Sequence, residues 1–353
     1  VMLPVGISFY TFQKMSYTID IYQGKSQPHR NFLDFALFVS FFPLLLSGPI
    51  ERARNLLPQI SAARSMGCLR LRVGVWLITW GLFKKIYIAD NIVGIVNPVF
   101  SPGWRGSGME ALVGTYAYAV QIYCDFSGYS DIAQGVAMLL GFEVMRNFEL
   151  PYFARNPSEF WRRWHISLST WLRDYVYFPL GGSRSGEWRT GRNLFITMLL
   201  VGLWHGAAWT FVLWGIYHGC LLIAHRMMSG HGQRHDQKRG PAILPDWLAV
   251  IGMFHLTCLG WMLFRADSAQ HVVTMLEAMV FEFVPTDLSF SLLGSLLGFS
   301  ALLLTVQLIQ NVRKTYDVLR DVPGAVHGIA YGVLFYLMVM HGGVSESFIY
   351  FQF

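Results

Sequence analysis

The sequence predicts an all-α protein that crosses a membrane several times, and three observations lead to this fold class. Of its 353 residues, 54% are hydrophobic and only 14% are charged, whereas a soluble domain carries about 25% charged residues. The apolar residues form runs, several of them near the ~20 residues that a helix needs to cross a bilayer. The basic residues are scattered between those runs, as in the cytoplasmic loops of a membrane protein. The composition therefore argues against a soluble enzyme, and the net charge of +6 forms no single basic face for nucleic acid.

The apolar runs are the expected helical elements. They cover residues 32–50, 71–100, 111–142, 193–226, 247–264, 288–310 and 324–342. Neither an internal repeat nor a low-complexity linker divides them, so we expect one integral-membrane domain over residues 1–353. The chain begins with Val1 and lacks the pattern of a signal peptide. We therefore expect it to start inside a longer protein whose earlier spans are missing.

The basic loops predict the orientation of the chain. By the positive-inside rule, four segments are expected in the cytoplasm and two short segments outside. The inside segments are 51–72, 143–192, 226–240 and 311–323, and the outside segments are 97–110 and 265–270.

The apolar run 193–226 has an inside segment at both of its ends, so it must enter the membrane and return. Its length gives roughly 50 Å of helix, which is too short for two full crossings of a ~30 Å core. We therefore expect a re-entrant helical pair, or a hairpin where the membrane is thin, with the break at Gly206-Ala207-Ala208.

The segment 143–192 is predicted to be a basic amphipathic cytoplasmic segment. Asn156, Pro157 and Glu159 have the types and spacing of a helix start. The run that follows predicts one helix with an aromatic stripe, lying against the membrane or the protein core. The stripe contains Trp161, Trp164, His165, Leu168, Trp171 and Leu172.

Two histidines are the strongest candidates for chemistry. His205 lies in the middle of an apolar run, where a polar side chain is costly and usually faces a cavity or the protein interior. His165 lies among the tryptophans of the aromatic stripe. Histidine suits proton transfer near neutral pH. From position alone, the alternatives are a core histidine bonded to a backbone carbonyl at 205 and an interfacial packing residue at 165.

Four charged residues also fall inside apolar runs. Asp125 and Asp131 need partners if they are buried, and we expect them to pair with arginines of the 143–192 segment or to shape a cavity. Lys84 and Lys85 are expected to extend to the membrane interface. The four cysteines show no metal or disulfide spacing, and no metal site is predicted.

Several stretches of the sequence resemble the membrane-bound O-acyltransferase family. The likeness is strongest to its bacterial branch, which O-acetylates exopolysaccharides such as alginate. The block Glu159–Tyr175, at a suitable distance from Trp204-His205-Gly206, is the most specific signal. The other matching stretches are Leu3–Phe12, Asp125–Asp131, Arg192–Leu194 and Phe348–Phe353. One position departs from the alginate pattern, because Leu44 stands where a histidine is expected, and this weakens alginate as the polymer.

The resemblance implies a multi-helix membrane fold with a central tunnel and re-entrant helices. It implies that His205 is the catalytic histidine and that His165 occupies the second polar position of the site. We expect substrate or donor binding by a further set of residues around them. These are Trp164, Arg162, Arg163, Trp204, Asp125 and Asp131.

The expected function is acyl transfer in the bacterial inner membrane. An acetyl or other acyl group would move from a cytoplasmic thioester donor, such as acetyl-CoA, across the membrane to a polysaccharide hydroxyl. No bound cofactor is expected, and the expected partners are the bilayer and a periplasmic acetyltransferase. Two alternatives stay open: D-alanyl transfer to teichoic acid from a carrier protein, and a transporter or channel with intramembrane histidines.

Overall fold

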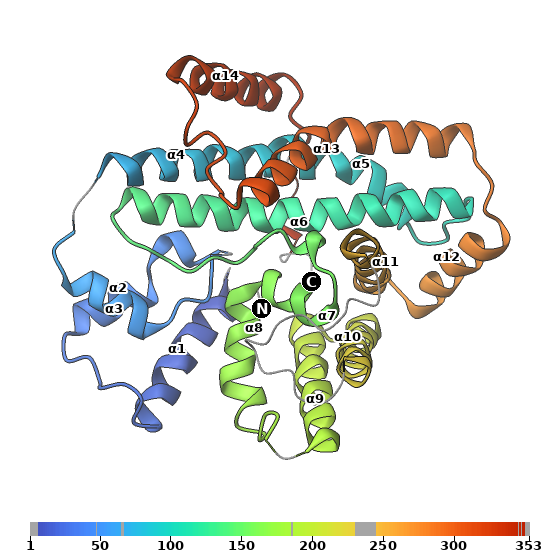
Figure 1. The fold of residues 1–353 in the computed structure, drawn as a ribbon. Helices are drawn as coiled ribbons and strands as arrows, with labels where there is room; N and C mark the ends of the chain where they lie inside the picture. Colours follow the sequence, from blue (N-terminus) through green and yellow to red (C-terminus); the bar gives the residue numbers. More distant parts are fainter. Residues whose placement is uncertain are drawn as a thin grey trace.

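The computed structural model describes residues 6–349 except 47, 65–66, 185, 230–244, 345 and 347. Every regular element in this part of the chain is a helix (Figure 1), so the predicted all-α class is confirmed. The first half contains α1 (Ile7–Tyr22), α2 (Phe32–Val39), the 3-10 turn η1 (Phe42–Leu44), α3 (Ala53–Ser61), α4 (Cys68–Leu82), the π-helical η2 (Phe83–Ala89), α5 (Asp90–Val99), α6 (Gly108–Leu139), η3 (Pro151–Phe153), α7 (Pro157–Arg163) and α8 (Ile166–Leu172). The second half contains the π-helical η4 (Arg173–Tyr177), α9 (Glu187–His205), α10 (Trp209–Met228), α11 (Asp246–Arg265), α12 (Ala269–Phe281), α13 (Asp287–Arg313) and α14 (Gly324–Met340).

Helices α4, η2 and α5 run without interruption alongside the 32-residue helix α6 (Figure 1). Glycines allow the two backbones to touch. A Cβ atom on Gly81 would lie 2.5 Å from the carbonyl oxygen of Gly128, and one on Gly135 would lie 2.6 Å from that of Gly74. Small residues that admit such close approach are typical of helix contacts in membranes. The pairing of 74 with 135 and of 81 with 128 makes the two rods antiparallel.

Helices α9 and α10 form the predicted hairpin. Helix α9 ends at His205 and α10 begins at Trp209, so the predicted break at residues 206–208 is confirmed. The arms of the hairpin are in contact, since a Cβ atom on Gly202 would lie 2.3 Å from the Phe211 carbonyl oxygen. The hairpin therefore presents the end of α9, with His205, at its tip.

Contacts at the two ends of the α4–α6 pair join segments that the orientation analysis places on the same side of the membrane. At one end, Arg70 pairs with Glu143 at 2.7 Å and Arg72 pairs with Asp317 at 3.1 Å, which joins three segments predicted to lie inside. At the other end, Arg265 donates to Asn97 at 3.1 Å, which joins the two segments predicted to lie outside. Most of segment 226–240 lies outside the described residues.

Three helices of the described part, α10, α11 and α13, are long and apolar enough to cross a bilayer. The prediction of one long helix over residues 32–50 is wrong, because only α2 and η1 form there. Pro43 is the second residue of η1, and Gly48 and Pro49 follow within a few residues, so the α-helix cannot continue. The predicted apolar runs also missed α1, α3 and α12.

Candidate active site

His165 lies at a sharp corner between α7 and α8. The predicted start of α7 is confirmed, because the Asn156 side chain accepts the backbone N–H of Glu159 at 2.8 Å. The prediction of one continuous helix through residue 173 is wrong. The chain turns at His165, whose φ of 41° and ψ of 55° are left-handed. A residue other than glycine is rare in this region, where backbone strain often accompanies function.

The turn points the imidazole of His165 into the protein core, where it is 1% exposed. Its ring lies nearly parallel to Phe9, with 6.2 Å between ring centres, and meets the edge of Phe126 at 4.6 Å. Neither ring nitrogen has a hydrogen-bond partner in the described part of the chain. The aromatic stripe of 143–192 thus packs on the protein core.

His205 occupies the last position of α9, directly before the break of the hairpin. Its half-buried ring is surrounded by aromatic side chains from three helices. The ring centres of Phe264 and Trp214 lie 4.9 Å and 5.1 Å away. Gly206 keeps the break tight, because a Cβ atom there would lie 2.5 Å from the Phe211 ring.

Trp204 brings the two histidines into one site. Its ring centre lies 4.8 Å from that of His205 and 6.3 Å from that of His165. The structure therefore brings together two residues that are 40 positions apart in the sequence.

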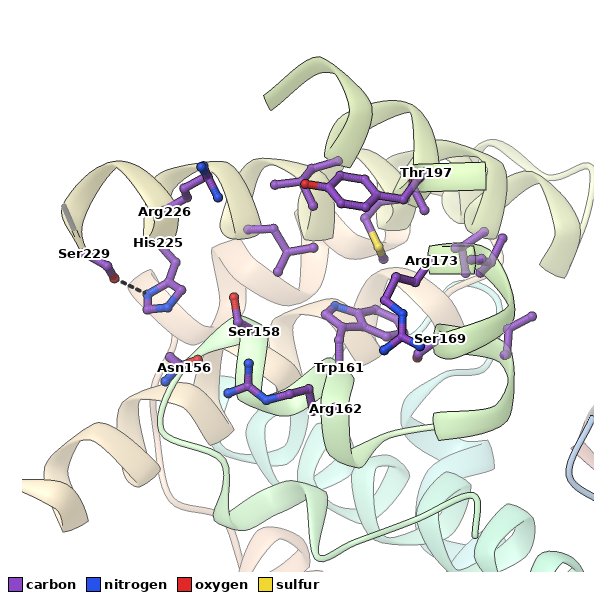
Figure 2. A pocket seen from close by; sticks show the side chains of 17 residues that line it. Asn156, Ser158, Trp161, Arg162, Ser169, Arg173, Thr197, His225, Arg226 and Ser229 are labelled. Atoms are coloured by element: carbon purple, nitrogen blue, oxygen red, sulfur yellow. Dashed lines mark hydrogen bonds between the residues drawn. The ribbon is translucent and has the colours of Figure 1, made fainter. Parts of the chain in front are cut away.

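A cavity of about 550 Å³ lies between α7, α8, η4, α9 and α10 (Figure 2), and Trp204, His165 and His205 are not among the residues that line it. Its α9 wall follows one helix face, made by Leu194, Thr197, Met198 and Val201. His205 is four residues beyond Val201, which is ~6 Å along a helix, and His165 precedes the lining residue Leu168 by three. The lining face of α9 therefore leads toward His205, and that of α8 toward His165.

The predicted binding residues of the 143–192 segment have different environments. Arg162 is exposed and lines the cavity together with Arg173 (Figure 2). Arg163 instead pairs with Glu159 at 2.7 Å. Trp164 is buried against Phe160 in the aromatic core. Arg162 is thus the member of this group that faces the cavity.

Glu159 fastens the same segment in place. Its carboxylate accepts the backbone N–H and the side chain of Arg155 at 3.0 Å and 3.1 Å. Burial raises the pKa of Glu159, but the hydrogen bonds from Arg155 and the charge of Arg163 outweigh it and hold that pKa below its ordinary value. The carboxylate therefore stays ionised at neutral pH and anchors α7.

Asp125 and Asp131 pair with lysines, so the expectation that arginines of the 143–192 segment hold them is wrong, whereas the alternative of shaping a cavity holds for Asp131, which lines one of about 220 Å³. Lys84 binds Asp131 at 2.7 Å, and Lys85 binds Asp125 at 2.9 Å and Asp90 at 2.7 Å. The expectation that both lysines extend to the interface is also wrong, since they are 2% and 8% exposed. The π-helical η2 carries them and faces α6, where the two aspartates lie.

The described residues contain no cluster of three metal-ligating side chains. Sequence reasoning missed two residues that the structure adds to the site: Arg173 in the cavity wall, and Asn147, which contacts the turn after His165. Arg173 could have been found because it directly follows Leu172, the last residue of the aromatic stripe. Asn147 has no local sequence signal, because its partners are 17 and 20 residues away.

Comparison with known proteins adds an independent finding. A model described as the membrane-bound O-acyltransferase family matches residues 7–264. The chain is 43% identical, over 79% of its own length and 52% of the relative's, to a Pseudomonas aeruginosa protein named "Probable alginate O-acetylase AlgI". It is 36% identical to a peptidoglycan O-acetyltransferase of Helicobacter pylori, over 79% of this chain and 57% of that one. It is 28% identical to a teichoic acid D-alanyltransferase of Bacillus subtilis, over 76% and 70%. The chain spans about half the length of the alginate O-acetylases that it matches.

Proposed function

The chain belongs to the membrane-bound O-acyltransferase family, and from this premise we propose that it transfers an acyl group, most simply acetyl, to a polysaccharide hydroxyl. The donor is a cytoplasmic thioester such as acetyl-CoA, bound as a substrate and not as a resident cofactor. The observation that carries the proposal is that both histidines lie close to Trp204, about one helical turn beyond Val201, which lines a cavity of about 550 Å³. A proton-transfer group, a second polar group and room for a donor are thus adjacent.

His205 acts as the general base. One ring nitrogen accepts the proton of the acceptor hydroxyl while the hydroxyl oxygen attacks the thioester carbonyl carbon. The carbon–sulfur bond then breaks, and the leaving sulfur takes the proton from the imidazole. An N–H of His165 donates to the carbonyl oxygen as negative charge develops there. The atoms and electrons of this transfer balance without a redox partner or a metal.

The cavity holds the donor. Arg162 and Arg173 contribute the positive charge that suits phosphate groups, and the acyl arm follows the lining face of α9 toward His205. The apolar lining residues of α8 and α9 keep water from the thioester. Trp204 positions both histidines, whereas Asp125 and Asp131 act indirectly, by holding α6 against η2.

The acceptor is a polysaccharide outside the cytoplasmic membrane. Two relatives are named for alginate and for peptidoglycan, and these names support a polysaccharide acceptor without fixing the polymer. In this proposal the protein resides in the bacterial inner membrane, and a periplasmic acetyltransferase is its partner in acetylating the polysaccharide.

A labelled-donor assay in membranes tests the proposal. Membranes that contain the wild-type protein are expected to form polymer-bound ester from labelled acetyl-CoA, and His205→Ala is expected to abolish it. The matched control is His255→Ala, which removes an exposed imidazole of α11 and is expected to keep full activity. Ester formation by stably inserted His205→Ala would overturn the catalytic role.

The same assay separates the alternatives. Labelling only from a D-alanyl carrier thioester would replace acetyl transfer with D-alanyl transfer, for which the Bacillus subtilis relative is the supporting observation. Solute flux in proteoliposomes without donor consumption would replace both with a transporter. Because each result excludes the others, the labelling and flux measurements together decide among the three functions.

A further inference from the structure

The strained turn at His165 is held by a segment that belongs to neither adjoining helix. The backbone of residues 147–149 runs beside it and exchanges two hydrogen bonds with it. The N–H of Ile166 donates to the carbonyl oxygen of Asn147 at 2.9 Å, and the N–H of Glu149 donates to that of Arg163 at 2.9 Å. These bonds lie on either side of His165, so they fix the backbone where it becomes left-handed.

The side chain of Asn147 adds a second set of contacts. Its Oδ1 accepts the hydroxyl of Ser167 at 2.6 Å and the backbone N–H of Ser167 at 3.3 Å. Its Nδ2 donates to the hydroxyl of Ser130 on α6 at 3.2 Å. Asn147 is 3% exposed. One buried amide therefore ties the start of α8 to α6.

This arrangement changes what the residue at position 165 must do. His165 is the N-cap of α8, where a side chain ordinarily accepts an N–H of the first helical turn. The imidazole makes no such bond, because Asn147 accepts the N–H of Ser167 in its place. The ring of His165 is thus released from capping and lies between Phe9 and Phe126.

We propose that Asn147 is the positioning residue for His165 in acyl transfer, an inference that rests on the proposed function. It caps α8 from outside the helix, anchors the turn to α6, and so keeps the imidazole aimed at Trp204 and His205. Asn147 touches no substrate in this assignment and acts only through the turn. Its loss therefore lowers the turnover number and leaves donor binding unchanged.

Two variants separate positioning from general damage. Asn147→Ala removes all the side-chain bonds and keeps the backbone ones. The Asn147 side chain lines a cavity of about 220 Å³ together with Gln134, so its removal gives water access to the groups that the amide had bonded. Asn147→Asp is nearly isosteric and keeps an acceptor for Ser167. The matched control is Gln134→Ala, since the Gln134 side chain donates to the carbonyl oxygen of Val144 at 3.4 Å and makes no contact with the turn at His165 among the described hydrogen bonds.

The experiment measures kcat and the donor KM in membranes, together with hydrogen–deuterium exchange of residues 165–169. Asn147→Ala is expected to lower kcat roughly tenfold or more, because small displacements of a reacting group are costly, with a donor KM within about twofold of wild type. Asn147→Asp is expected to restore part of the kcat, and Gln134→Ala to match wild type. The amides of Ile166 and Ser167 are expected to exchange faster in Asn147→Ala.

Wild-type kcat in Asn147→Ala, or an equal loss in Gln134→Ala, would overturn the proposal. The exchange measurement needs no activity, so it separates this inference from the proposed function. If the wild-type protein transfers no acyl group, the proposed function fails on its own. If hydrogen–deuterium exchange at Ile166 and Ser167 is unchanged in Asn147→Ala, the role of Asn147 in holding the turn is overturned in either case.

Discussion

Replacing Lys85 by methionine is expected to destabilise the protein more than any other lysine substitution in its described part. The ammonium group of Lys85 serves two carboxylates, Asp90 and Asp125, whose side chains are each 4% exposed. It also donates to the carbonyl oxygen of Glu346 at 2.9 Å. Methionine fills a similar volume but provides no charge, so the variant leaves two buried carboxylates without their shared cation.

The expected magnitude follows from this geometry. Removing one partner of a buried ion pair costs about 3–5 kcal/mol, whereas replacing the whole group by neutral residues is often neutral. The triple variant Lys85→Met, Asp90→Asn, Asp125→Asn is therefore expected to recover most of the loss. Asparagine at 125 also keeps an acceptor for the N–H of Ile349, which donates to Asp125 at 2.8 Å.

Unfolding of the purified protein in mixed detergent micelles, titrated with a denaturing detergent, measures these free energies. Lys25→Met is the matched control, because Lys25 is exposed, and it is expected to change the free energy of unfolding by less than about 0.5 kcal/mol. The reasoning is refuted if Lys85→Met costs less than about 1 kcal/mol. It is refuted equally if the triple variant is as unstable as the single one, since the cost would then not come from unpaired charge.

Three further outcomes test separate parts of the structure. Gly128→Ala is expected to cost about 1–3 kcal/mol in the same unfolding assay, because its Cβ atom would lie 2.8 Å from the Gly81 carbonyl oxygen. Arg162→Gln is expected to raise the donor KM roughly tenfold or more with little change in kcat, and an unchanged KM would remove Arg162 from the donor site. The pKa of Glu159 is lowered in the folded protein from its ordinary value of 4.5, so its contribution to stability is present above pH 4.5 and is lost as the pH falls through the folded-state pKa. Glu159→Gln is therefore expected to be less stable than wild type at neutral pH and to lose less stability on acidification, and parallel acid profiles would contradict this.

The sequence predicts the parts of the site that depend on local pattern. His205 is identifiable because a titratable side chain in the middle of an apolar run is costly and usually faces a cavity or the protein interior. The break after it follows from charge at both ends of a run too short for two crossings. The start of α7 follows from Asn156, Pro157 and Glu159, whose capping geometry needs only neighbours in the chain. In each case the deciding interaction spans only a few residues or a single helix.

The left-handed turn at His165 could not be predicted in this way. Its residues continue the spacing of an amphipathic helix, and local propensity favours continuation there. The competing hydrogen bonds come from Asn147, 18 positions earlier, and become available only once α6 and segment 147–149 are packed. The prediction of one helix failed because a tertiary contact overrode a local pattern.

The buried charges follow the same logic and give α6 a central role. Lysines at 84 and 85 look like interfacial residues until η2 packs on α6, where Asp125 and Asp131 neutralise them. On the same helix, Phe126 contacts the ring of His165, and Ser130 accepts the hydrogen bond from the side chain of Asn147. The ion pairs on one face of α6 therefore hold this helix in place, and another face of the same helix contacts and positions His165. A loss of activity in Asp125 or Asp131 variants is then expected to come with a loss of stability, whereas His205 variants are expected to lose activity alone.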